Sequence, residues 1–220
     1  ESVQTLTCEI RKDTPLPDGE VIRWLSRVHY QRPDKLHVEN FSPAKRRIVS
    51  DGTVFRSYAD GAPQGFSRPV ADLNEEMLLN LRMVPGSAAN LLEVLKGVPE
   101  EPLEPTAEFP TRVGYDNGKS FAVLSLDGQG RLARFEIFSS KAMVDLQIRT
   151  DFSAFQEILP GVWLAGLQQS KVMLQGLERT ETTRVDNVAA NRELPVALFD
   201  AAAFFSGVEF VDSFEKIGLP

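Results

Sequence analysis

The chain has 220 residues, of which 42% are hydrophobic and 25% are charged, as in ordinary globular proteins. Its net charge of −7 argues against a nucleic-acid partner, because domains that bind nucleic acid are usually basic. One cysteine excludes an internal disulfide and a cysteine-rich zinc site, and no run reaches the roughly 18 apolar residues that span a bilayer. We expect one domain over residues 1–220, since this length supports a sizeable single core.

Residues 2–12 alternate between apolar and polar positions, the pattern of a strand with one buried face. Cys8 falls on the apolar face. We interpret it as a small buried hydrophobe. The alternative is a reactive thiol, which needs partial exposure and a cationic neighbour.

The stretch from Val21 to Tyr58 predicts four short strands folded back on themselves. Turn residues separate them: Pro presets φ, Asp bonds its own backbone, and Asp51-Gly52 is the strongest hairpin signal in the chain. The predicted strands cover residues 21–31, 35–41, 46–50 and 53–58. If the first two strands pair with positions summing to 66, His29 lies opposite His37, and Arg27 opposite Glu39.

A basic cluster, Lys45-Arg46-Arg47, lies at the tip between two of these strands. We interpret it as a solvated hairpin tip, with contact to an anionic lipid as the alternative.

The period then changes from two to that of a helix. Asp72 is a candidate cap for a helix through Arg82, with Glu75 at the capping-box distance, and Pro85-Gly86 ends the pattern. A second helix is expected from Ser87 to Lys96, with Gly97 as its stop. Two short Leu- and Met-rich helices over about 72–96, placed between two sets of strands, suggest a lid or plug.

After an acidic, Pro-rich connector over residues 98–110, strand patterns resume. We expect strands at 111–115, 119–126, 131–138 and 143–150, one helical turn within 152–159, a strand region starting at 162, and strands at 171–177 and 180–188. Residues 191–199 are expected to leave the sheet, and 208–211 to add an edge strand. The sum is a mainly β fold: a curved antiparallel half-barrel of about ten to twelve strands with an internal helical lid.

An apolar cleft between such a sheet and the lid would bind a hydrocarbon chain by removing apolar area from water, at roughly 0.8 kcal/mol per methylene. Methionines suit irregular cargo because they are flexible. The competing interpretation is that the same residues form a solid core. The candidate lining residues are Trp24, Val28, Tyr30, Leu36, Val38, Phe135, Ile137, Leu146 and Ile148 from the sheet, and Met77, Leu81, Leu91 and Leu95 from the lid.

A family resemblance rests on the order of several motifs. The run QRPDKLHVENFSPAKRRIVSDGTVFRSY, followed by a short strand and helices, resembles the LolA-type outer-membrane lipoprotein carriers and the broader lipoprotein-sorting proteins. LDGQGRLARFEIF is similar to the family's second-half hairpin, and VDNVAANRELPVALF to its closing segment. The resemblance implies a LolA-like half-barrel that holds acyl chains between sheet and lid. It also implies that Arg32, just before the Pro of the first turn, bonds to the lid and keeps the empty state closed.

Catalysis finds little support in the sequence. A nucleophilic triad would need Cys8 or a serine near His29 or His37, and both histidines are on the polar face of their strands. We interpret them as a surface pair; the alternative, a metal site, lacks an evident third ligand. No glycine-rich phosphate loop precedes a helix, and no carboxylate pair stands in an apolar context. We expect no enzyme activity, no cofactor and no metal.

Two functions remain open. The first is carriage of lipid or acylated lipoprotein cargo, with envelope proteins as donor and acceptor. The second is a non-catalytic sensory or protein-interaction module of the envelope on the same fold, and a hydrolase is a distant third. The sequence shows no signal peptide, and we expect a monomer that is periplasmic or otherwise exported, with a lipid anchor left open.

Overall fold

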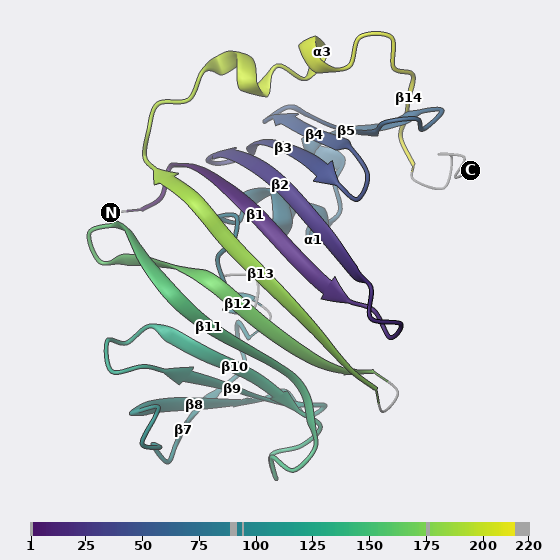
Figure 1. Ribbon diagram of the computed structural model, residues 1–220. Helices are drawn as coiled ribbons and strands as arrows, with labels where there is room; N and C mark the ends of the chain where they lie inside the picture. The colour runs from purple at the N-terminus through teal and green to yellow at the C-terminus, as the bar shows by residue number, and fades with distance from the viewer. Residues whose placement is uncertain (1, 89–91, 94, 175–176, 214–220) are drawn as a thin grey trace.

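A computed structural model describes residues 2–88, 92–93, 95–174 and 177–213. In these residues fourteen strands form one continuous sheet (Figure 1), antiparallel throughout except for the pairing of the last strand with β6. The predicted fold class, a curved and mainly β half-barrel with few helices, is confirmed. The strand count is larger than the ten to twelve predicted.

The sheet consists of two meanders. The first contains β1 (Thr5–Pro15), β2 (Val21–Gln31), β3 (Lys35–Ser42), β4 (Arg46–Asp51), β5 (Val54–Ala59) and β6 (Gly65–Pro69). The second contains β7 (Glu100–Leu103), β8 (Thr111–Asp116), β9 (Phe121–Leu126), β10 (Leu132–Phe138), β11 (Leu146–Leu159), β12 (Val162–Leu174) and β13 (Leu177–Ala190). β1 pairs with β13 and joins the meanders, and β14 (Phe210–Val211) adds to the edge at β6, as the sequence predicted.

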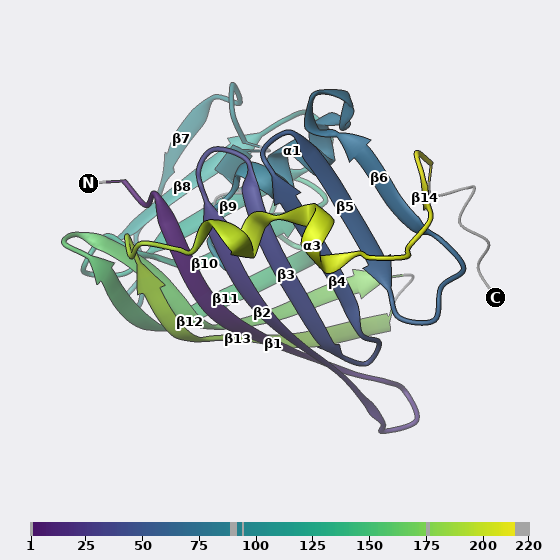
Figure 2. The same ribbon diagram turned by 90° about the horizontal axis from the view of Figure 1, so that it is seen from above.

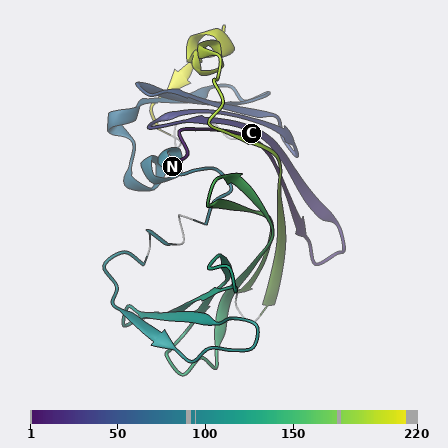
Figure 3. The same cartoon turned by 90° about the vertical axis from the view of Figure 1, so that its left-hand side faces the viewer.

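This strand order dictates what covers the sheet. β6 and β7 lie near opposite edges, so the chain between them must cross from one edge region to the other. It does so inside the bend of the sheet (Figure 3), and we name its described first part, residues 70–88, the lid. After β13 in the centre, the chain returns to the edge beyond β6 across the outside of the first meander (Figure 2); residues 196–211 are named the strap. The sheet therefore has an inner face, toward the lid, and an outer face.

The lid starts with a 3-10 turn, η1 (Val70–Asp72), and continues as α1 (Glu75–Arg82). The predicted cap, Asp72, was wrong: it ends the 3-10 turn, and the Asn74 side chain caps α1 by accepting from the Met77 amide at 2.8 Å. Of the predicted second helix, Leu92 and Glu93 are helical. The strap contains η2 (Val196–Phe199) and α3 (Ala201–Phe204), and no helix in the described part of the chain is long and apolar enough to cross a membrane.

The register of the first meander agrees with the sequence. His29 pairs with His37, and Arg27 with Glu39. The Asp51 carboxylate accepts from the backbone amides of Thr53 and Val54 at 2.7 and 2.8 Å, which fixes the tight turn between β4 and β5.

The predicted helical turn over 152–159 was wrong, because these residues continue β11. Ala154 has φ of 52°, a left-handed residue inside the strand, and Phe152 and Phe155 on either side of it belong to the same apolar cluster on the inner face. Their spacing of three therefore looks helical in the sequence. Gly166 on β12 leaves room for this local conformation, since a Cβ there would lie 2.7 Å from the Ala154 carbonyl oxygen.

A bulge between β10 and β11 changes the position of Leu146. Ile137 pairs with Ile148 but the next residue, Phe138, pairs with Leu146, so one residue of β11 is left over. Leu146 consequently packs with Phe138 on the outer face, whereas Ile137 packs inward. Its predicted place beside Ile148 in the cleft was wrong.

The other boundary differences are in the second meander. The predicted connector over 98–110 contains β7, and the predicted strand at 171–177 is the end of β12 together with the start of β13. The sequence of β7 lacks a strand pattern because it contains proline and acidic residues, which an edge strand such as β7 tolerates.

Candidate functional site

The candidate site is the inner face of the sheet beneath the lid, where two cavities adjoin. The first cavity has a volume of about 290 Å³, and the second about 500 Å³. Gly86 and Ser87 line both. The lid therefore divides one hollow of the inner face into two parts.

Side chains from both sheet and lid enclose the first cavity. Val28, Leu36 and Val38, all predicted as lining residues, form its floor on β2 and β3. Met83, Val84 and Pro85 lie on the lid side. Alternation along the two strands directs these apolar side chains inward, so the cavity follows from the period-two pattern of the sequence.

The lid is held to the first meander by apolar packing. Leu81 is 2% exposed and belongs to a cluster with Phe55 and Phe66 of the sheet, and Met77 packs against the same cluster. A cluster of this kind is a solid core. Met77 and Leu81 were predicted to face cargo; they anchor α1 instead of lining either cavity.

Polar contacts fix the end of α1. The Tyr30 hydroxyl donates to the Arg82 carbonyl oxygen at 2.7 Å, and the Arg82 guanidinium pairs with Asp34 at 2.7 Å. Tyr30 is fully buried, and burial raises the pKa of its hydroxyl, while the neighbouring Arg32 guanidinium opposes the rise. The phenol thus stays protonated and can donate to the lid.

Arg32, the predicted latch, is exposed, and its backbone amide donates to Gln4. Its guanidinium lies beside the Tyr30 hydroxyl, close enough to act on its pKa. The turn is instead joined to the lid by Asp34, two residues after Arg32, which forms an ion pair with Arg82 of α1. The latch role of Arg32 stays a prediction.

Where the lid crosses the centre of the sheet, two close approaches hold it. Gln168 of β12 donates to the Gly86 carbonyl oxygen at 2.7 Å. Gly86 has φ of 76°, and a Cβ there would lie 3.0 Å from Val185 of β13. A glycine is required at this point because of both its φ and the contact. The Pro85-Gly86 stop seen in the sequence is therefore also the crossing point.

The second cavity is larger and its walls are aromatic. Phe152, Phe155 and Trp163 line it together with Leu164 and Ala165. None of these was a predicted site residue, because Phe152 and Phe155, on either side of the left-handed Ala154, have a helical spacing in the sequence. The sequence indicated this aromatic lining only through the aromatic residues on two consecutive segments, β11 and β12.

At the rim of the second cavity, Arg131 lies against two aromatic rings. Its guanidinium is 4.3 Å from the Phe155 ring centre and 5.1 Å from that of Trp163, and it pairs with Asp127. Burial raises the pKa of Asp127, but the hydrogen bonds from Arg131 outweigh it and lower the pKa overall. The pair is ionised and closes one side of the cavity.

The remaining predicted residues lie apart from the two cavities. Phe135, Ile137 and Leu95 join the cluster beneath the second cavity, and Ile148 pairs with Ile137. Trp24 is 42% exposed near the start of β2. Leu91 lies outside the described residues.

The residues considered for catalysis or metal binding, Cys8, His29 and His37, line neither cavity. Among the described residues no three His, Cys, Asp or Glu side chains lie together in a way that could hold a metal ion. Cys8 is 2% exposed, and burial raises the pKa of its thiol to about 12, which fits a buried hydrophobe. The histidine pair is on the outer face, but the prediction of an exposed surface pair was wrong, because His37 is buried under the strap.

Solved structures resemble this chain over nearly its whole length. A LolA superfamily protein from Nitrosomonas europaea has a TM-score of 0.56 and 13% identity, covering 92% of this chain and 93% of that one. An outer membrane lipoprotein-sorting protein domain from Vibrio parahaemolyticus has a TM-score of 0.56 and 10% identity, covering 92% of each chain. A DUF1329 family protein from Desulfovibrio piger has a TM-score of 0.54 and 14% identity, also covering 92% of each.

No protein-family model and no curated protein matches the sequence. At these identities the structural likeness establishes the fold. The chain has a LolA-like fold, as the motif order in its sequence predicted.

Proposed function

We propose that the protein binds the acyl chains of a lipid or acylated lipoprotein between the inner face and the lid, and carries them within the bacterial cell envelope. The observation that carries this proposal is the pair of adjoining cavities beneath one crossing segment. The likeness in fold to a lipoprotein-sorting domain supports it. Envelope proteins would deliver and accept the cargo, and the chain itself would act as a non-enzymatic monomer.

Simple energetics support binding of this kind. Ten buried methylenes contribute roughly 8 kcal/mol, which corresponds to a dissociation constant of about 1 μM. Displacing the lid from the centre of the sheet makes binding weaker than this. The hydrogen bond from Gln168 to Gly86 must break before one acyl chain can occupy both cavities. Binding that is favourable but opposed by a closing lid suits a carrier, which must release its cargo.

A second candidate is a scaffold for protein interaction with a filled interior. The observation in its favour is that Tyr30, Leu81 and Phe135, all predicted to face cargo, are 0–2% exposed and belong to solid clusters. Under this alternative the two cavities are packing defects.

Two measurements separate the candidates. One is mass spectrometry of the lipids that organic solvent extracts from the purified protein, and the other is titration of the protein with an apolar fluorescent dye. A carrier binds the dye at a fixed stoichiometry and releases it to a lipidated peptide. Val38→Trp, which fills the first cavity, should weaken dye binding about tenfold, equivalent to about 1.4 kcal/mol. Val144→Trp, at a site 86% exposed, is the matched control. No lipid, no dye binding and no effect of Val38→Trp would favour the scaffold.

The role of Arg32 is tested in the same assay. Arg32→Leu removes the cation beside the Tyr30 hydroxyl and should speed dye release. An unchanged release rate would remove Arg32 from the mechanism while leaving binding in the cleft intact.

A further inference from the structure

The strap lies on the outer face of the first meander, on the opposite side of the sheet from the cleft (Figure 2). Three of its phenylalanines each lie over a cation of the sheet. Lys35 is 5.9 Å from the ring centre of Phe199, Arg47 is 4.8 Å from Phe204, and Arg56 is 5.2 Å from Phe210. The strap is thus attached by separate ring contacts and by a small apolar cluster around Val49, Ala201 and Phe205.

One titratable side chain is enclosed beneath the strap. His37 is 2% exposed, and the Phe204 ring covers it at 4.6 Å between ring centres. Among the described residues, neither ring nitrogen makes a well-formed hydrogen bond. A neutral imidazole tolerates this place, but a charged one loses its water and gains only the Leu198 carbonyl of the strap in return.

The charges around His37 come from three strands. His29 on β2 lies 5.9 Å away between ring centres, and burial, followed by the nearby Arg27 on the same strand, lowers the pKa of His29. Glu39 on β3 favours the protonated form of His37, and Arg47 on β4 opposes it while pairing with Glu39. From the strap only the Leu198 carbonyl favours protonation. Glu39 and Leu198 offset only part of the cost of burying a charge, so the pKa of His37 is lowered overall.

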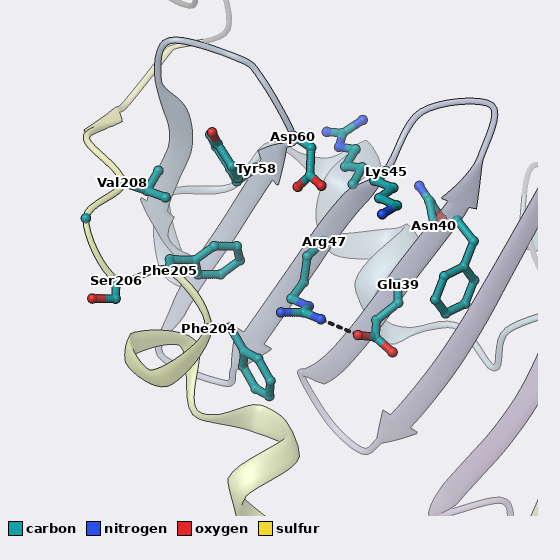
Figure 4. A pocket seen from close by; sticks show the side chains of 13 residues that line it. Glu39, Asn40, Lys45, Arg47, Tyr58, Asp60, Phe204, Phe205, Ser206 and Val208 are labelled. Carbon is teal, nitrogen blue, oxygen red and sulfur yellow. Dashed lines mark hydrogen bonds and ion pairs between the residues drawn. The ribbon is translucent and has the colours of Figure 1, made fainter.

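We infer that the strap is an acid-released cover: protonation of His37 detaches residues 196–206 from the outer face. The imidazolium can regain water only if Phe204 moves away. The strap is close to solvent, since a cavity of about 620 Å³ lies beside Phe204, Phe205 and Val208 (Figure 4). Detachment would expose the Arg47–Glu39 pair, drawn as a dashed line in Figure 4, and Tyr58.

The sign follows from linkage. Burial, the largest cause, and the neighbouring Arg47 and His29 lower the pKa of His37 below its ordinary value of 6.5 in the attached state. Attachment is therefore fully favoured above pH 6.5 and weakens as the pH falls toward the lowered pKa. Across that window the ratio of detached to attached strap rises by at most about tenfold per pH unit, as for one proton.

The test places a nitroxide label on the strap through Ser206→Cys. Ser206 is exposed, and the native Cys8 does not compete for the label because its pKa is raised to about 12. We expect the label to gain mobility as the pH falls from 8 to 4.5. A label at Ser140→Cys, exposed after β10 in the second meander, should not change.

His37→Gln, which cannot be charged, should keep the strap label immobile at every pH in this range. His29→Gln is the matched control and should retain the transition. Equal mobility of the wild-type label at pH 8 and 4.5 would overturn the inference. So would a transition that persists in His37→Gln or disappears only in His29→Gln.

A second measurement does not depend on the folding of the His37 variant. Phe204→Ala uncovers the imidazole, and NMR titration should show the pKa of His37 moving up toward 6.5. The coupling must be reciprocal: if the strap lowers the pKa of His37, protonation must weaken the strap. An unchanged pKa in Phe204→Ala would overturn the inference even if the strap label responds to pH.

Discussion

The two meanders of the sheet differ in what covers them. The first has the lid on its inner face and the strap on its outer face, and Phe66 at its edge is 2% exposed. The second borders the larger cavity, where Trp163 is 41% exposed. Chain connectivity causes the difference, because the strap and the helix of the lid, α1, both pack on the first meander. We infer that the first meander is a rigid support and that the second provides the room for an apolar ligand.

The largest expected effect is in the first meander. Leu81→Ala removes the lid side chain that is buried against Phe55 and Phe66, and should reduce the free energy of unfolding by about 2–5 kcal/mol. Leu177→Ala, at a site 66% exposed in the second meander, should change it by less than about 0.5 kcal/mol. Urea titration followed by circular dichroism measures both. Similar losses would contradict the contrast between the meanders.

A smaller loss is expected where the second meander bends. Gly166→Ala puts a Cβ 2.7 Å from the Ala154 carbonyl oxygen, so β11 must shift at Ala154 at a cost of about 1–3 kcal/mol. Gly128→Ala is the matched control, since a Cβ there meets nothing within 4 Å. Equal unfolding free energies for the two variants would show that β11 adapts without strain.

Next in size is the polar anchor of the lid. Tyr30→Phe leaves the Arg82 carbonyl without its donor and should lower stability by about 0.5–1.5 kcal/mol. Because the lost bond holds the end of α1, hydrogen exchange should also show faster exchange of the backbone amides of residues 75–83. Tyr58→Phe removes a similar bond, to the Ala62 carbonyl on the outer face, and should leave exchange in the lid unchanged.

The smallest effect concerns the boundary between the cavities. Gln168→Ala frees the Gly86 carbonyl and should tighten binding of an apolar dye about 2–10-fold, because one opposing bond is lost. Gln169→Ala, exposed on the neighbouring position of β12, is the control. Weaker dye binding in Gln168→Ala would mean that the crossing segment supports the ligand instead of excluding it.

The sequence predicted the features that depend on local chemistry. The Asp51-Gly52 turn follows from a carboxylate that bonds two amides, and the His29–His37 pairing follows from one turn and one alternating strand. The floor of the first cavity at Val28, Leu36 and Val38 follows from the same alternation.

Features set by local backbone irregularities or by distant segments could not be predicted. One residue in left-handed conformation gives β11 a helical spacing, and a bulge near the start of β11 puts Leu146 on the outer face. His37 looks like a solvent-facing residue on a polar face until Phe204, far along the chain, covers it. Neither kind of feature has a signature in the nearby sequence.

The junction of β1 and β13 has a consequence for how the molecule forms. Near this junction the Gln4 amide donates to the Asn191 side chain, 187 residues away. Each meander consists of neighbouring hairpins that can assemble early, whereas their union must await synthesis of β13. Until then β1 exposes an unpaired edge, so a nascent molecule is most prone to aggregate at what later becomes the middle of its sheet.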